Sequence, residues 1–222
     1  MIKILVQLTK VLGIYKFLKN LILKINLKFG LGHGHNLFLY IIKKRNKDFK
    51  NFLEIGSTRE EIYGQGSTKI IAEYCENRMI NFTSVDADIK NVNRLNISLG
   101  HLKYFNIIFD KGENFLKKTT NKYDCVYLDA FDIEKKIDNL NRNEFYEKIY
   151  HTSITNENSE NIHLEIVMSL KEKINEKAII VFDDTFINKD KFYGKGGKAI
   201  PFLRNIGFKV IAQNSNSVAL ER

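Results

Sequence analysis

The chain has 222 residues, of which 44% are hydrophobic and one is proline, and it carries a formal net charge of +9. This length and composition exclude a disordered or fibrous protein and predict one main folded domain with its own core. The two cysteines, Cys75 and Cys125, form no CxxC pair, so we expect reduced thiols in a cytoplasmic protein.

The positive charge is concentrated near the N-terminus. Residues 1–50 contain eleven lysines and arginines and one acid, a charge of +10, so the other residues sum to −1. A domain that grips a polyanion carries its basic residues on its own surface. We therefore expect no nucleic-acid partner.

Residues 2–28 predict a helix, because polar residues and lysines fall on one stripe and large apolar residues fill the rest. Such a helix either packs on the domain or on a second copy in a homodimer, or it lies in the plane of an anionic membrane. The second alternative makes it a peripheral contact at the inner membrane face. Lysines interrupt its apolar stretch, so we expect neither a membrane-spanning helix nor a signal peptide.

A loop at 30–36 and a second helix lead to the first strand. We treat residues 1–49 as a basic, amphipathic helical extension and residues 50–222 as the main domain. His33 and His35 have no third ligand close in the sequence, so we do not predict a metal site there.

Residues 51–68, NFLEIGSTREEIYGQGST, predict a short buried strand, a glycine-rich turn and the start of a helix. Glycines let the backbone approach a ligand, and the free N–H groups of the first helical turn face it. Ser67 or Thr68 can cap that turn. The pattern indicates either a nucleotide-like ligand at the end of this strand or an ordinary turn in an α/β domain.

Acids follow the next two strands. NFTSVDAD ends in Asp86, which stands about twenty residues past the glycines and is placed to bind both ribose hydroxyls. LKYFNIIF is followed by DKGENFL, where Glu113 could accept a hydrogen bond from an adenine amino group. A solvated loop acid explains Glu113 equally well.

Two later strands deliver three more carboxylates to the same edge of the sheet. YDCVYLDAFD ends in Asp129, and KAIIVFDDTF ends in Asp183 and Asp184. Unpaired like charges this close are costly, and Mg²⁺ bound by oxygen ligands removes the repulsion. The alternative is that Asp129 serves the cofactor while Asp183 and Asp184 cap a loop.

Candidates for a catalytic base lie between these two strands. HLEIVMSLKEKI predicts an amphipathic helix with His163 in its first turn, facing the same edge of the sheet. A capping or surface histidine is the alternative, and Asp132 is the second candidate base. Four aromatic residues can stack on a sugar or simply pack: Phe131, Phe145, Tyr146 and Tyr150.

The C-terminal region completes the predicted fold. A helix containing Pro201 stops at Gly207, and FKVIAQ and SVALER follow as two antiparallel strands joined by a tight turn. The chain therefore predicts an α/β, Rossmann-like, seven-stranded and mostly parallel sheet with a C-terminal antiparallel hairpin and helices on both faces.

Over residues 50–222 the chain resembles the class I S-adenosylmethionine-dependent methyltransferases, and among them the macrocin O-methyltransferase-like, metal-dependent group. The resemblance rests on FLEIGS with GQGST, SVDAD, YDCVYLDAFD, IIVFDDT and GKGGKAIPFL. It implies Asp86 on the ribose, Glu113 on the adenine, and Mg²⁺ on Asp129, Asp183 and Asp184. It also implies a set of residues around the methionine part of the cofactor: Glu54, Gly56, Gly64, Gly66 and Ser67. We expect Ser57, Thr68 and Asp129 to be cofactor-binding residues as well. STREEIY separates Gly56 from Gly64, which stretches the first motif beyond the usual spacing.

The resemblance implies an O-methyltransferase acting on a hydroxyl of a sugar, glycan or other small molecule, with S-adenosylmethionine and Mg²⁺ as cofactors. The sulfonium methyl is already activated, so the enzyme must align it with an oxygen whose proton a base removes. Two alternatives stay open. One is an aminopropyltransferase-like enzyme on the same fold, and the other is a non-catalytic, membrane-docked Rossmann-like protein.

Overall fold

The computed structural model describes residues 14–45, 48–59, 66–134 and 140–222. The helices are α2 (Ile14–Phe29), α3 (Gly34–Arg45), α4 (Ser67–Glu76), α5 (Ile89–Leu99), α6 (Gly112–Lys118), α7 (Leu140–Tyr150), α8 (Asn156–Leu170) and α9 (Ala199–Asn205). The strands are β1 (Asn51–Ile55), β2 (Asn81–Asp86), β3 (Phe105–Phe109), β4 (Tyr123–Leu128), β5 (Ile174–Phe182), β6 (Thr185–Asn188), β7 (Lys191–Gly194), β8 (Lys209–Gln213) and β9 (Val218–Glu221).

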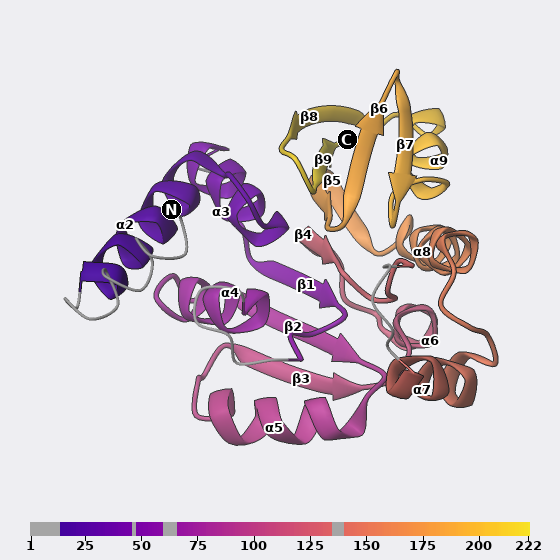
Figure 1. Ribbon diagram of the computed structural model, residues 1–222, viewed down its shortest axis with the longest axis horizontal. Helices are drawn as coiled ribbons and strands as arrows, with labels where there is room; N and C mark the ends of the chain where they lie inside the picture. Colours follow the sequence, from indigo (N-terminus) through magenta and orange to yellow (C-terminus); the bar gives the residue numbers. More distant parts are fainter. Residues whose placement is uncertain (1–13, 46–47, 60–65, 135–139) are drawn as a thin grey trace, which may run out of the picture.

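Seven strands form one sheet in the order β3-β2-β1-β4-β5-β9-β8. Neighbouring strands from β3 to β5 are parallel, and β9 runs antiparallel to both β5 and β8. The predicted fold is therefore confirmed, including the C-terminal hairpin and a single antiparallel strand next to the edge (Figure 1).

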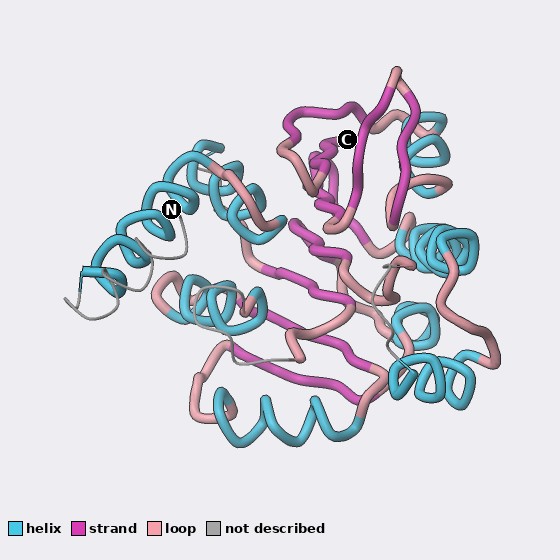
Figure 2. The backbone as a smooth tube through the Cα atoms, in the orientation of Figure 1, coloured by secondary structure: helices cyan, strands magenta, loops and turns pink. Residues whose placement is uncertain are grey.

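Side chains along the central strands alternate between two hydrophobic cores, as the period of a strand requires. Phe52 of β1 packs with α3, α4 and α5 on one face, whereas its neighbour Leu53 packs with α6, α8 and α9 on the other. The same alternation holds for Tyr127 and Leu128 of β4. The molecule is thus a three-layer arrangement with helices on both faces of the sheet (Figure 2).

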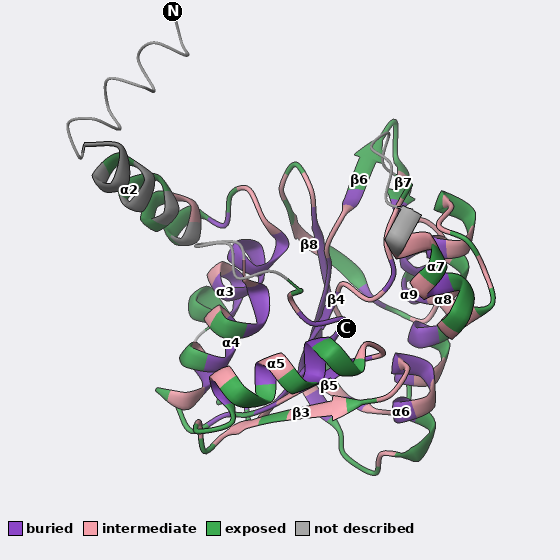
Figure 3. Ribbon diagram, turned by 60° about the horizontal axis from the view of Figure 1, so that its bottom comes forward, coloured by how far each residue is buried: buried purple, intermediate pink, exposed green. Residues whose placement is uncertain are grey.

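The N-terminal helices differ in how they join this arrangement. α3 places Leu37, Phe38 and Ile42 in the core beside β1 and β4. α2 packs on α3 and extends away from the sheet (Figure 3). The helix expected over residues 2–28 is confirmed from Ile14 onward, and its first part lies outside the described residues. The loop expected at 30–36 is shorter, because α3 already begins at Gly34.

One element was not expected from the sequence. The strand read as KAIIVFDDTF ends at Phe182, and the chain turns at Asp184, whose φ is +41°. It then forms a separate antiparallel hairpin of β6 and β7. This hairpin returns the chain to the carboxyl end of β5, where Lys195 follows Gly194.

The strand order reverses direction between β1 and β4, because the chain adds β2 and β3 on one side and β5 on the other. In open α/β sheets such a switch point leaves a crevice at the carboxyl ends of the two strands, and ligands bind there. The fold therefore places the candidate site beyond Ile55 and Leu128, the last residues of these strands.

Candidate functional site

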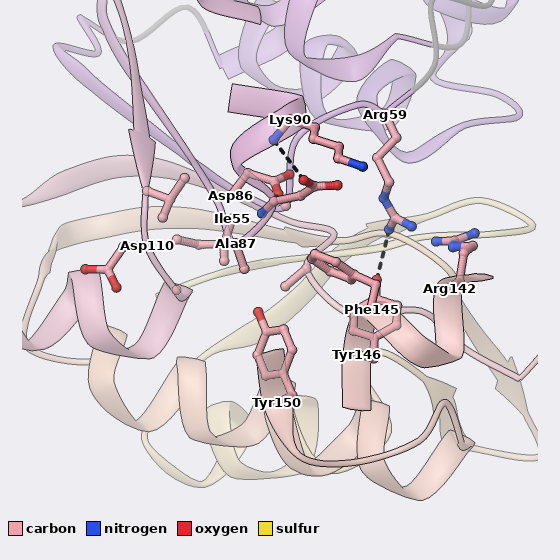
Figure 4. Close-up of a pocket in the computed structure, with 15 residues that line it drawn as sticks. Ile55, Arg59, Asp86, Ala87, Lys90, Asp110, Arg142, Phe145, Tyr146 and Tyr150 are labelled. Carbon is pink, nitrogen blue, oxygen red and sulfur yellow. Dashed lines mark hydrogen bonds between the residues drawn. The ribbon is translucent and has the colours of Figure 1, made fainter. Parts of the chain in front are cut away.

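A cavity of about 250 Å³ lies at the carboxyl ends of β1, β2, β3 and β4. Asp86 and Asp110 line it on the side of β2 and β3, and Arg59 and Arg142 line it on the other side (Figure 4). Aromatic rings from α7 close its wall. The cavity therefore lies at the switch point that the topology identifies.

Gly56 forms the wall of the cavity where β1 meets β4. Its φ is +91°, and a Cβ at this position would collide with the backbone carbonyl of Asp129. The backbone N–H of Asp129 in turn donates to the carbonyl of Ile55 at 2.8 Å. Only glycine fits this crossing, which keeps the strand end open to a ligand.

Asp86 ends β2 and is fixed by three donors. The backbone N–H groups of Ser57 and Asp88 donate to its carboxylate at 2.8 and 2.7 Å, and the amide of Asn91 donates at 2.8 Å. Burial raises the pKa of Asp86, and these hydrogen bonds oppose that shift. The structure places Asp86 in the cavity, as expected, with Ser57 holding it from β1.

Asp110, directly after β3, lines the cavity, whereas Glu113 does not. Asp110 accepts a hydrogen bond from Lys118 Nζ at 2.7 Å. Glu113 lies one turn later in α6, is 8% exposed, and its pKa is raised by burial. Asp110 is therefore better placed than Glu113 to reach a ligand in this cavity, and the adenine contact of Glu113 stays a prediction.

Glu54, Ser67 and Thr68 form a buried network behind the cavity. The hydroxyls of Ser67, Thr68 and Ser84 donate to the Glu54 carboxylate at 2.8, 2.8 and 2.6 Å. None of these side chains lines the cavity, and their expected contact with the cofactor stays a prediction. Their role is to hold α4 against β1 and β2.

The start of α4 also differs from expectation. Gly66 is the N-cap and has no side chain to cap the helix. The Thr58 hydroxyl accepts from the Thr68 backbone N–H at 3.1 Å instead, while Ser67 and Thr68 are already the first two residues of the helix. Gly64 lies outside the described residues.

Asp132 is bound by two arginines. Both terminal nitrogens of Arg59 donate to its carboxylate, at 3.0 and 2.9 Å, and Arg142 forms a second ion pair with it. Arg59 also donates to the Tyr146 hydroxyl at 3.1 Å. A carboxylate held by two cations is a poor proton acceptor, so Asp132 does not fit the role of general base.

The three aspartates predicted to bind Mg²⁺ surround a lysine. Lys195, 1% exposed, forms ion pairs with Asp129 and Asp184, the latter at 3.1 Å. Burial alone would lower the pKa of Lys195, but the charges of Asp129, Asp184 and Asp183 hold it above its ordinary value. Gly194, with φ +75°, positions this lysine, because a Cβ there would collide with the Asp184 carbonyl.

Asp183 makes its hydrogen bonds to β4 and to its own turn, and it lies against the start of α3. The Tyr127 hydroxyl donates to it at 2.5 Å, and the Asp184 backbone N–H donates at 2.9 Å. A Cβ on Gly34, the first residue of α3, would lie 2.7 Å from its Oδ1. Burial and the charge of Asp129 raise the pKa of Asp183 to about 7.

Nothing in the described residues supports the predicted Mg²⁺ site on Asp129, Asp183 and Asp184, which stays a prediction. Among the described residues, no three histidine, cysteine or acidic side chains are grouped to hold a metal ion. The positive charge that offsets the carboxylates comes from Lys195, which the sequence reading missed because the β6–β7 hairpin was not foreseen.

His163 lies in the middle of α8 and not in its first turn. It is fully buried, and its Nδ1–H donates to the Ser159 carbonyl at 2.8 Å. Burial and the charge of Lys195 lower its pKa to about 3. A histidine with no exposed surface cannot reach a substrate proton, so the expectation that it is the base is wrong.

The four aromatic candidates divide between the two roles. Phe131 is fully buried, with ring centroids 4.1 Å from Tyr146 and 5.4 Å from Tyr150. Phe145, Tyr146 and Tyr150 line the cavity. Phe131 thus packs against the aromatic wall, and the other three face the cavity.

Taken together, fold and cavity define a Rossmann-like α/β protein with a cavity at its switch point. In three dimensions the chain is similar to PH0851, with a TM-score of 0.54 and 16% identity over 82% of this chain and 44% of that one. It is also similar to the ribosomal protein L11 methylase from Lactobacillus delbrueckii subsp. bulgaricus, with a TM-score of 0.51 and 12% identity over 85% of this chain and 78% of that one. The protein therefore has a methyltransferase-type fold.

Sequence comparison gives a shorter match. No family model matches the chain. It is similar to the polyamine aminopropyltransferase of Buchnera aphidicola subsp. Acyrthosiphon pisum, with 33% identity over 99 residues. The match covers 38% of this chain and 32% of the relative, so the chain spans about a third of that relative's length. These similarities do not bear on the macrocin O-methyltransferase-like group, and its implied metal ligands are not reproduced here.

Proposed function

We propose that the chain is an S-adenosylmethionine-dependent methyltransferase that acts on a hydroxyl of a sugar, glycan or other small acceptor. The observation that carries this proposal is the cavity, where Gly56, Asp86 and Asp110 meet at adjacent strand ends. The ribose hydroxyls and adenine amino group of an adenosyl ligand are hydrogen-bond donors, and carboxylates accept from them. The donor set therefore fits this cofactor.

The arginines favour S-adenosylmethionine over its decarboxylated relative. Arg59, Arg142 and Asp132 together carry a surplus positive charge, and the buried Nε of Arg142 has no hydrogen-bond partner among the described residues. A methionine carboxylate supplies the missing anion and can accept charge-assisted hydrogen bonds. The decarboxylated relative, which an aminopropyltransferase uses, lacks that group.

When bound, S-adenosylmethionine supplies a methyl group that is already activated. The chain must then orient the acceptor and take its proton. We assign the first task in part to Asp129, which directly follows β4 beside Ala130 of the cavity wall; its ion pair with Lys195 makes it, like Asp132, a hydrogen-bond acceptor and not a general base. The Asp129 side chain is 26% exposed, and its ion pair with the buried Lys195 fixes its orientation. Lys195 is therefore a positioning residue.

The alternative function is aminopropyl transfer, which the local similarity to polyamine aminopropyltransferase favours. A polyamine acceptor is a cation and needs free carboxylates in its site. Asp129 and Asp132, the acids after β4, are already paired with Lys195, Arg59 and Arg142. The positive charge beside Arg59 and Arg142 therefore fits an anionic cofactor group at that end of the cavity.

Calorimetric titration with the two cofactors separates these functions. We expect the wild-type chain to bind S-adenosylmethionine at least about tenfold more tightly than the decarboxylated form, since hydrogen bonds to charged groups contribute roughly 1.5–3 kcal/mol. Arg142→Gln should remove most of that preference, and Arg204→Gln, on the exposed end of α9, should retain it. Tighter binding of the decarboxylated cofactor would favour the aminopropyltransferase.

A further inference from the structure

The surface of α2 is unusually apolar for a helix that projects from the molecule. Five large side chains are between 41% and 55% exposed, at positions spaced by three or four residues: Leu18, Leu21, Ile22, Ile25 and Phe29. That spacing places them on one stripe of the helix. Leu31, just past its end, is 47% exposed and extends the stripe. Burial of such a stripe normally requires a partner surface.

A basic groove runs beside this stripe. Lys24 and Lys28 of α2 face Lys43 and Lys44 of α3 across a groove of about 460 Å³, and Tyr40 forms its floor. No acid lines the groove, and residues 14–45 contain no aspartate or glutamate at all. Arg45 lies in the same segment, but its charge is offset by an ion pair with Glu221, so we do not count it among the charges of the groove. The groove therefore presents four neighbouring positive charges.

The angle between the two helices is fixed by the turn that joins them. Gly30, with φ +67°, packs against the Tyr40 ring, and the Leu31 N–H donates to the Asn26 carbonyl at 2.9 Å. The Asn214 amide donates to the Gly30 carbonyl at 2.9 Å, which ties this turn to the loop before β9. These contacts hold α2 against the start of α3, with the groove between the two helices.

We propose that α2 and the adjoining end of α3 dock on an anionic phospholipid bilayer, with the apolar stripe among the acyl chains and the four lysines at headgroup phosphates. Amphipathic helices with flanking lysines bind such interfaces in the membrane plane. None of the described helices is long and apolar enough to cross a bilayer, which agrees with an in-plane arrangement.

The charge and apolar character of this surface favour an anionic bilayer over two other partners, a second copy of the chain and nucleic acid. A second copy docked on the same face would bring two acid-free lysine clusters together, and like charges repel. Nucleic acid offers phosphates for the lysines but no apolar partner for the stripe. An anionic bilayer satisfies both halves of the surface.

The test is vesicle flotation with the full chain. We expect binding to vesicles of phosphatidylcholine mixed with phosphatidylglycerol, and little binding to phosphatidylcholine alone. Each lysine near an anionic surface contributes about 1 kcal/mol, so removing four should weaken binding by roughly a hundredfold or more. The variant is K24Q/K28Q/K43Q/K44Q, and the matched control with equal charge change on exposed lysines elsewhere is K122Q/K171Q/K177Q/K209Q.

A second variant, I22S/I25S, keeps every charge and changes only exposed side chains, so it should fold normally and still lose vesicle binding. Equal binding to neutral and anionic vesicles, or no binding to either, would overturn the proposal. So would a dimer in solution that I22S/I25S dissociates, which would assign the stripe to a second copy. Binding to duplex DNA without binding to vesicles would assign the lysines to nucleic acid.

Discussion

The ammonium of Lys195 lies 3.1 Å from Oδ2 of Asp184 and forms a second ion pair with Asp129. These groups come from three places in the chain, namely the ends of β4 and β5 and the residue after β7. A side-chain cation thus occupies the position where the acids at the sheet edge suggested a metal.

Replacing Lys195 with Met should destabilise the fold. The change leaves Asp129, Asp183 and Asp184 close together without their cation, and breaking a buried ion pair costs about 3 kcal/mol. Urea unfolding at neutral pH measures this loss. The matched control is Lys191→Met on β7, which is exposed and should change little. Equal stability of K195M and wild type would show that the ion pairs contribute nothing.

The same lysine predicts a loss of stability in alkali. Its pKa is raised in the folded state, so its contribution is complete below the pKa of the unfolded chain and is lost as the pH rises through the folded value. The stability difference between wild type and K195M should therefore stay constant from neutral pH to about pH 10 and shrink above it. A difference that already shrinks near neutrality contradicts this assignment.

Glu54 predicts a pH dependence of the opposite kind. Burial raises its pKa to about 7, against hydrogen bonds from Ser84, Ser67 and Thr68 that lower it. The folded state therefore binds a proton that the unfolded chain has released, so stability falls as the pH rises from about 4.5 to 7. Glu54→Gln should remove up to about 3 kcal/mol of that fall.

Unfolding curves of wild type and E54Q across this pH range measure the effect. Asp183 titrates in the same range, so the difference between the two proteins, and not the wild-type slope, reports on Glu54. Parallel curves would mean that Glu54 is ionised throughout.

Two glycines give a matched pair of substitutions. Gly56→Ala should destabilise the fold and abolish cofactor binding, because its φ is +91° and its Cβ would collide with the Asp129 carbonyl. Gly66→Ala should be tolerated, since φ is −77° and, among the described residues, only the Thr58 methyl lies near, at 3.7 Å. Thermal unfolding and calorimetry compare the two. Equal behaviour would show that the strand crossing at Gly56 is not constrained.

The order and ends of the strands could be predicted from the sequence because each strand is a short apolar run with a clear boundary. Apolar runs that stop at an acid gave the positions of Asp86, Asp129 and Asp183, and the tight turn before β9 gave the antiparallel hairpin. These are local features, and each depends on a few consecutive residues.

The errors concern side chains brought together by distant segments. Lys195 reaches Asp129 only because the β6–β7 hairpin returns the chain, and nothing local to Asp129 signals this. Arg59 and Asp132 likewise form an ion pair although they are far apart in the sequence, and nothing local to either residue signals it. Asp110 directly follows β3, whereas Glu113 lies in the first turn of α6. To predict which of the two carboxylates lines the cavity, one must know the exact residue at which β3 ends. Glu54 belongs to the motif that resembles the methyltransferases, yet its carboxylate oxygens accept hydrogen bonds from hydroxyl groups of this same chain.

The most direct measurement is calorimetric titration of the folded chain with S-adenosylhomocysteine. The account predicts one bound ligand per chain, weakened about tenfold or more in Asp110→Asn, where a carboxylate facing the cavity loses its charge. Asp48→Asn, on the exposed loop before β1, should bind like wild type. Absence of binding to the folded wild-type chain, or equal binding by Asp110→Asn, would contradict the adenosyl site at this cavity.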